Sequence, residues 1–157
     1  MAEGWGRIQL EVVTPEGQVL SAEVDEITAP AALGYFGVLP GHTPFLTTLG
    51  MGELGYRIGN QWEYLAITWG YAEVLPNNVT ILAETAEMAE EIDVERAERA
   101  KRRAEERLRE WSTTGAEIDF ERASAALQRA LIRLQVAGKR VGPGTLRQAE
   151  VRGRRAE

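Results

Sequence analysis

Residues 91–97 read EIDVERA and residues 117–123 read EIDFERA, so one seven-residue pattern occurs twice with a single difference. Each copy stands directly before a run rich in alanine and arginine, in which apolar residues recur at steps of three and four. That period is typical of an α-helix, and aspartate at the positions of Asp93 and Asp119 caps helix N-termini well. The sequence therefore predicts two helices that begin at these points, and the chain divides at about Ile92.

The part of the chain before Ile92 has the pattern of β-structure. Residues 8–12 alternate apolar with polar side chains, as a half-buried strand does. Later apolar runs are separated by residues 59–61 (Gly-Asn-Gln) and 76–78 (Pro-Asn-Asn), which favour tight turns. We expect about six to eight short strands before residue 85, and because no helical period intervenes, an antiparallel β-sandwich or barrel.

Residues 34–46 are rich in both glycine and proline, with three of the first and two of the second. Fixed turns are predicted here, because the apolar side chains of the segment still need burial. We therefore interpret the segment as an ordered loop. Within it, Tyr35 and Phe36 are either anchors in the core or an exposed contact surface.

The two predicted helices differ in their apolar faces. The first has a thin, alanine-rich stripe, and the second has a richer one that ends at Gly138. Because only a short loop joins them, they should lie antiparallel as a helical hairpin. The stripes consist of Val94, Ala97, Ala104, Leu108 and Trp111 on the first helix, and of Phe120, Ala123, Leu127, Ala130, Leu131 and Leu134 on the second.

These patterns predict three regions of the chain. Residues 1–88 form the β-sandwich domain, residues 89–138 form the helical hairpin as a regulatory domain, and residues 139–157 form a basic, disordered tail. The fold class expected is therefore β plus α, with the sandwich first and the hairpin second.

Composition removes several classes of function. The chain has no cysteine and one histidine, His42, so we expect no metal site. No catalytic set is visible, and His42 is interpreted as structural or as part of a subunit contact. The amino terminus lacks the pattern of a signal peptide and no segment has the length of a membrane span, so a cytoplasmic location is the default.

Charge is distributed unevenly. Residues 1–92 carry two basic and thirteen acidic side chains, whereas residues 93–157 carry sixteen basic and eleven acidic ones. A basic half is compatible with a nucleic-acid-binding module, which would bind duplex DNA in a salt-dependent way. Acidic side chains interleaved at helical spacing favour a solvated, self-paired helix surface instead.

Residues 34–47 read GYFGVLPGHTPFLT, residues 79–86 read VTILAETA, and residues 92–97 read IDVERA. In this order and spacing the chain, from about Ile8 to Gly138, resembles the epsilon subunit of bacterial F-type ATP synthases. The resemblance implies a sandwich of about ten strands that binds the gamma subunit and the ring of c subunits. It also implies a hairpin that can restrain ATP hydrolysis by extending into the alpha/beta catalytic head. The subunit would be non-catalytic and peripheral to the cytoplasmic face of the bacterial inner membrane. No nucleic acid is expected as a partner.

The resemblance also assigns a subunit contact to the loop. It places this loop at the end of the sandwich that faces the c-ring. The residues expected in contacts with the c-ring or gamma subunit are Gly34, Tyr35, Phe36, Gly37 and His42.

Arginine spacing suggests an anion site in the hairpin. Arg96 and Arg103 lie seven apart and share a face, and Arg129 and Arg133 lie four apart on one face. Converging guanidinium groups need an anion between them, and the arginine fork suits phosphate oxygens. The alternative is that each arginine pairs with a nearby glutamate, since Glu95, Glu98, Glu105 and Glu106 are at hand.

The resemblance adds ATP as a regulatory ligand of the hairpin. Some bacterial epsilon subunits bind ATP through a motif Ile/Leu-Asp-x-x-Arg-Ala together with arginines of the second helix. The matching residues here are Glu87, Ile92, Asp93, Arg96, Ala97, Arg103, Arg129 and Arg133, and the Asp93 and Glu87 carboxylates could accept hydrogen bonds from an adenine amino group. The second copy of the pattern is interpreted as a repeated cap. A thin apolar stripe stabilises the folded hairpin only weakly, so we expect ATP to stabilise the compact state.

Overall fold

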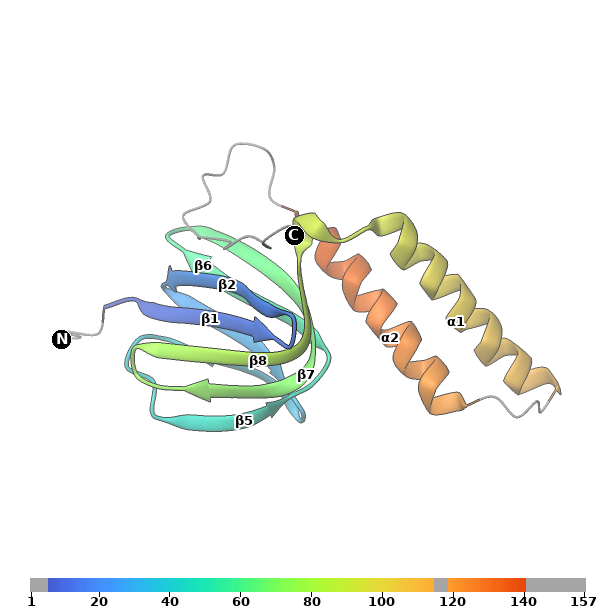
Figure 1. Ribbon diagram of the computed structural model, residues 1–157, viewed down its shortest axis with the longest axis horizontal. Helices are drawn as coiled ribbons and strands as arrows, with labels where there is room; N and C mark the ends of the chain where they lie inside the picture. Colours follow the sequence, from blue (N-terminus) through green and yellow to red (C-terminus); the bar gives the residue numbers. More distant parts are fainter. Residues whose placement is uncertain (1–5, 115–118, 141–157) are drawn as a thin grey trace.

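The computed structural model describes residues 6–114 and 119–140. A β-sandwich carries a pair of helices at one side, and the second helix lies nearer the sandwich than the first (Figure 1). The strands are β1 (Ile8–Thr14), β2 (Gly17–Val24), β3 (Glu26–Ala31), β4 (Gly34–Val38), β5 (Phe45–Leu49), β6 (Gly52–Ile58), β7 (Gln61–Val74) and β8 (Asn78–Met88). A single turn of 3-10 helix, η1 (Ala89–Glu91), leads into the helices α1 (Val94–Thr114) and α2 (Phe120–Ala137).

The strands join in the order β2-β1-β8-β7-β5-β3-β4, and β6 pairs with both β3 and β7. Strands β5 and β6 therefore each connect β3 to β7, which closes the sheet on itself. All pairs are antiparallel except β1 with β8, which is parallel. The fold class expected from the sequence is confirmed, with this one parallel pair added.

Eight strands are described where the resemblance implies about ten, because β7 and β8 are long. The first half of β7 pairs with β6 and its second half pairs with β5. Between the halves, Trp69 has a φ of 33° and Gly70 a φ of 135°. A side chain at Gly70 would meet the carbonyl oxygen of Leu82, so glycine lets β7 bend here while it stays paired with β8.

The core is built from the inward positions of these strands. Side chains with no exposure include Leu10, Val12, Ile27, Leu54, Leu65, Ile67, Val74 and Ile81. Tyr56 is also fully buried, and its hydroxyl donates a hydrogen bond to Glu63 at 2.6 Å. The alternating pattern of residues 8–12 holds, since Ile8, Leu10 and Val12 are all buried.

The interpretation of residues 34–46 as a loop was partly wrong. Residues 34–38 form β4, which pairs antiparallel with β3 from Gly34 opposite Ala31 to Val38 opposite Ile27. Pro30 lies within β3. Proline has no N–H to donate, but its carbonyl still accepts a hydrogen bond from the Gly50 N–H at 3.0 Å.

The helices form the expected hairpin, with a thin contact between them. On α1, Ala97 and Ala104 are buried, whereas the two ends of the predicted stripe, Val94 and Trp111, are 39% and 44% exposed. On α2, Ala123 and Ala130 are buried, while Leu131 is exposed. Small residues on both sides let the helices approach closely but remove little apolar surface from water.

Candidate functional site

The hinge between sandwich and hairpin has a small apolar core of its own. Ile92 is 2% exposed and packs with Ala66 of β7, Ala89 of η1, and Val136 and Ala137 at the end of α2. The start of the hairpin and its end therefore meet at one place on the sandwich. This apolar contact is one of the attachments of the hairpin to the β-domain.

Residues 93–97 of the first copy and residues 119–123 of the second form the same helix start. The Asp93 carboxylate accepts a hydrogen bond from the Arg96 N–H at 2.9 Å. The Asp119 carboxylate accepts one from the Arg122 N–H at 3.1 Å. The alanine that closes each copy, Ala97 or Ala123, is buried. The pattern thus combines a helix cap with a small residue at the first contact of the hairpin.

Glu87 and Arg133 are brought together from strand β8 and helix α2. Arg133 Nη2 donates to Glu87 Oε1 at 2.8 Å, and Arg133 Nε lies 2.6 Å from Glu87 Oε2 as an ion pair whose N–H is not aligned for a hydrogen bond. The two side chains are 21% and 35% exposed. The Glu87 carboxylate thereby holds the guanidinium group of Arg133 at the hinge, and Arg133 is one of the arginines predicted to bind an anion.

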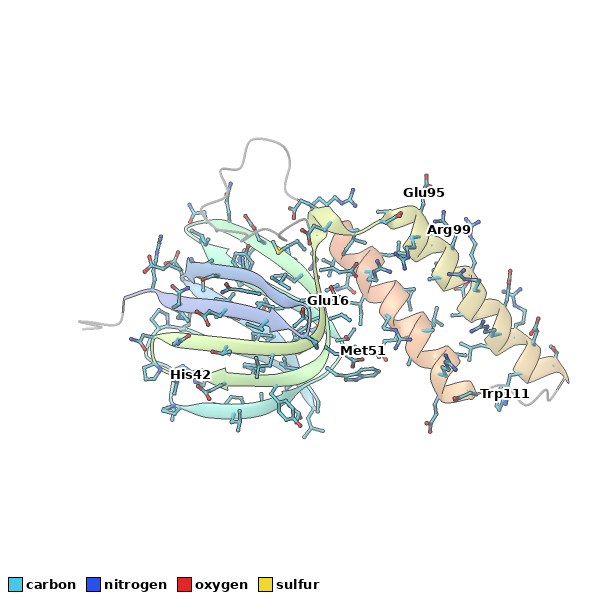
Figure 2. All side chains as sticks on the ribbon, in the orientation of Figure 1. Glu16, His42, Met51, Glu95, Arg99 and Trp111 are labelled. Carbon is cyan, nitrogen blue, oxygen red and sulfur yellow. The ribbon has the colours of Figure 1, made fainter. Side chains whose placement is uncertain are left out.

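The other arginines of the set are not engaged in this way. Arg96 and Arg103 are exposed and Arg129 is half-buried. Within residues 6–114 and 119–140, none of these three guanidinium groups forms an ion pair. Pairing with helix glutamates is found at Arg99, which lies 3.8 Å from Glu95 on the solvent side of α1 (Figure 2). Three cationic groups of the hairpin are therefore available to an anion.

The predicted contact residues of the loop divide into two groups. Phe36 packs partly buried against the core and edge-to-face on Phe45, with ring centroids 5.6 Å apart. Tyr35 is 63% exposed, and its hydroxyl accepts a hydrogen bond from the Glu53 N–H at 3.1 Å. His42 lies at the far end of the sandwich from the hairpin (Figure 2), where its Nδ1 lies 2.7 Å from the Thr43 carbonyl oxygen.

Gly34 and Gly37 are the remaining loop residues of that set. Gly34 begins β4 with a φ of 141°, a conformation that glycine favours, directly after the fully exposed Leu33. Gly37 lies within β4, opposite Thr28 of β3. Gly34 therefore shapes the turn of the β3–β4 hairpin that presents Tyr35.

A group of exposed apolar side chains on the outer face of β5, β7 and β8 was not predicted from the sequence. Leu46 of β5, Tyr71 of β7 and Leu82 of β8 are 70%, 57% and 50% exposed, and Tyr71 lies directly opposite Leu82. The signal was present, because Leu82 follows the inward-facing Ile81 where alternation calls for a polar residue. Neighbouring exposed apolar side chains of this kind are a feature of interaction surfaces.

The described ranges hold no cluster of metal-binding side chains. Neither described helix has the length and apolar character needed to cross a membrane.

Two family models together match most of the chain. Residues 7–89 match the beta-sandwich domain of the ATP synthase delta/epsilon chain, and residues 90–138 match its long alpha-helix domain. The chain belongs to this family. The boundary between the two matches coincides with η1, where the strands end and the hairpin begins.

Curated bacterial relatives are epsilon chains. An ATP synthase epsilon chain of Syntrophotalea carbinolica is 56% identical over 133 residues, which are 85% of this chain and 95% of the relative. The epsilon chain of Geobacter metallireducens is 54% identical over the same share of each chain. This chain is therefore similar over nearly the whole length of bacterial epsilon subunits, which belong to the central stalk of F-type ATP synthases.

Chains in solved ATP synthase structures share this fold. A chain in the mitochondrial ATP synthase of Euglena gracilis, described as OSCP/F1/c-ring, superposes with a TM-score of 0.69 at 27% identity, covering 87% of this chain and 86% of that one. A central stalk and c-ring structure of Tetrahymena thermophila superposes with a TM-score of 0.51 at 15% identity and shares the fold.

Proposed function

We propose that this epsilon subunit is a non-catalytic part of the rotor that couples the gamma subunit to the c-ring. It acts at the cytoplasmic face of the bacterial inner membrane, held there by the complex. Support comes from the exposed apolar side chains of the sandwich, which offer contact area to partner subunits. The exposed Tyr35 and Leu33 at the β3–β4 hairpin support a contact with the c-ring there.

The hairpin is proposed to restrain ATP hydrolysis by leaving the sandwich and extending into the alpha/beta head. The carrying observation is that the compact hairpin is attached mainly through the end of α2, while α1 and α2 contact each other largely through alanines. Such a contact opens at low cost. An equilibrium of this kind is readily shifted by a ligand that binds one state better.

ATP is the proposed ligand of the compact state. The phosphates would lie among Arg96, Arg103, Arg129 and Arg133, three of which have no ionic partner in the described residues. Arg133 would have to share its guanidinium between Glu87 and a phosphate. Asp93 already accepts a backbone hydrogen bond as helix cap, which leaves its second carboxylate oxygen for the adenine amino group.

Calorimetric titration of ATP into the full chain tests this site. Replacing both Arg103 and Arg129 by alanine should abolish measurable binding while the sandwich stays folded, because two of the groups that neutralise the phosphates are lost. Arg99→Ala is the matched control, since Arg99 lies on the same helix and outside the proposed set; it should bind ATP like the unmodified chain. Unchanged affinity in the double variant would rule out the site.

A further inference from the structure

Two basic residues follow the end of α2 and fold back onto the hinge. Lys139 and Arg140 lie directly after Gly138, the last residue that the family model matches. Their backbone remains ordered on the helix end, because the Lys139 N–H donates to the Val136 carbonyl at 2.9 Å and the Arg140 N–H donates to the Ala137 carbonyl at 3.4 Å.

Arg140 joins the end of the hairpin to its beginning. Its Nε donates to the Ala89 carbonyl at 3.1 Å, and its Nη2 donates to the Ile92 carbonyl. These carbonyls belong to η1 and to the residue that ends it, where a helical turn leaves carbonyl groups without partners of its own. A guanidinium fork can satisfy both at once, which a lysine ammonium cannot do with the same geometry.

Lys139 attaches the same point to the sandwich. Its Nζ lies 2.7 Å from Glu53 Oε1 of β6 and 4.5 Å from the ring centre of Tyr64 of β7. The hydrogen bond that Lys139 donates to the Glu53 carboxylate is the main cause that raises the pKa of Lys139. Gln135 also reaches Glu53, at 3.4 Å.

We propose that Lys139 and Arg140 form a clasp that contributes to the stability of the compact hairpin whether or not a nucleotide is bound. The hairpin cannot leave the sandwich, and α2 cannot separate from the start of α1, without breaking the contacts of this clasp. The clasp thus acts beside the proposed ATP site and does not depend on it. It assigns a role to the first two residues beyond the segment that the family models match.

Hydrogen exchange of the full chain without nucleotide tests the clasp. In Arg140→Ala, amides of residues 89–97 should exchange about tenfold faster than in the unmodified chain. In the unmodified chain, this segment can open only if the hydrogen bonds to the charged Arg140 guanidinium break, and that requirement makes opening rarer. The exchange rate in Arg140→Lys should lie between those of Arg140→Ala and the unmodified chain, since an ammonium group replaces the forked guanidinium group. Amides of the sandwich core, such as those of β1 and β8, should be unchanged in both variants.

Arg102→Ala is the control, because Arg102 is an exposed arginine of α1 outside the clasp; it should exchange like the unmodified chain. Lys139→Ala should speed exchange at the end of α2 independently of Arg140. Equal exchange of residues 89–97 in Arg140→Ala and the unmodified chain would overturn the proposal, and so would acceleration that is uniform across the sandwich. Hydrogen exchange without nucleotide does not measure ATP binding. A negative result for the clasp would therefore not argue against the ATP site, and a negative result for the ATP site would not argue against the clasp.

Discussion

Gly70 occupies a position in β7 that no other residue type could fill without strain. It combines a φ of 135° with a direct approach to β8, where an added Cβ would lie 1.8 Å from the Leu82 carbonyl oxygen. Neither the strain nor the clash can be relieved without moving one of the two longest strands. The bend in β7 therefore requires glycine at this position.

Gly70→Ala should lower the free energy of unfolding by about 3 kcal/mol or more, since backbone strain and a backbone clash add. Gly17→Ala separates the two causes. Gly17 has a φ of 129° but open space around the Cβ position, so it should lose only about 1 kcal/mol. Urea unfolding followed by circular dichroism measures both, and equal losses would contradict the clash.

Asp25, which lies between β2 and β3, contacts Arg7 before β1 and Gly59 between β6 and β7. Its carboxylate accepts a hydrogen bond from the Gly59 N–H at 2.6 Å and another from Arg7 Nε at 3.1 Å. The Gly59 hydrogen bond is the largest cause that lowers the pKa of Asp25, with the Arg7 charge adding to it against partial burial. The ionised form is thus favoured in the folded state.

Because the pKa of Asp25 is lower in the folded state, its carboxylate stabilises the folded state. This contribution to the free energy of unfolding is fully present above the unfolded-state pKa of about 3.9, and it is lost as the pH falls through the folded-state pKa. Asp25→Asn should therefore be less stable at pH 7 by about 1 kcal/mol and should lose less stability than the unmodified chain between pH 5 and about pH 2. Urea midpoints over this range measure the difference. Parallel pH curves would contradict the prediction.

At the scale of elements, the ion pair between β8 and α2 couples the hairpin to the sandwich. A double-mutant cycle with Glu87→Gln and Arg133→Gln should give a coupling free energy of about 1 kcal/mol, because the ion pair includes one charge-assisted hydrogen bond but is partly exposed. Glu84→Gln on the exposed face of the same strand is the control and should show no coupling. A coupling free energy near zero in urea unfolding would contradict a docking role.

The elements show how far local pattern reaches. The helix starts at Asp93 and Asp119 were predictable, because a cap and its N–H partner lie three residues apart. Strand β4 was not, since glycine and proline spacing describes turns well but cannot show that β3 lies alongside to pair. The pairing of Glu87 with Arg133 across 46 residues was missed for the same reason. Arginine spacing and the resemblance assigned the two residues to one site without showing that they bind each other.

At the scale of the whole molecule, the uneven charge acquires a structural meaning. The acidic sandwich supplies Glu53 and Glu87, and the basic half supplies Lys139 and Arg133, so the attraction between the two halves acts at the docking point of the hairpin. The compact state should therefore weaken at high salt.

The central claim is that the hairpin must leave the sandwich to restrain ATP hydrolysis. Because the chain has no cysteine, Glu53→Cys and Lys139→Cys can be joined by a short bis-maleimide across the contact that those two side chains now make. Steady-state ATP hydrolysis by F1 assembled with this variant is then compared with and without the cross-link, with the unmodified chain plus reagent as control. The account predicts faster hydrolysis when the hairpin is locked compact; an unchanged rate would contradict it.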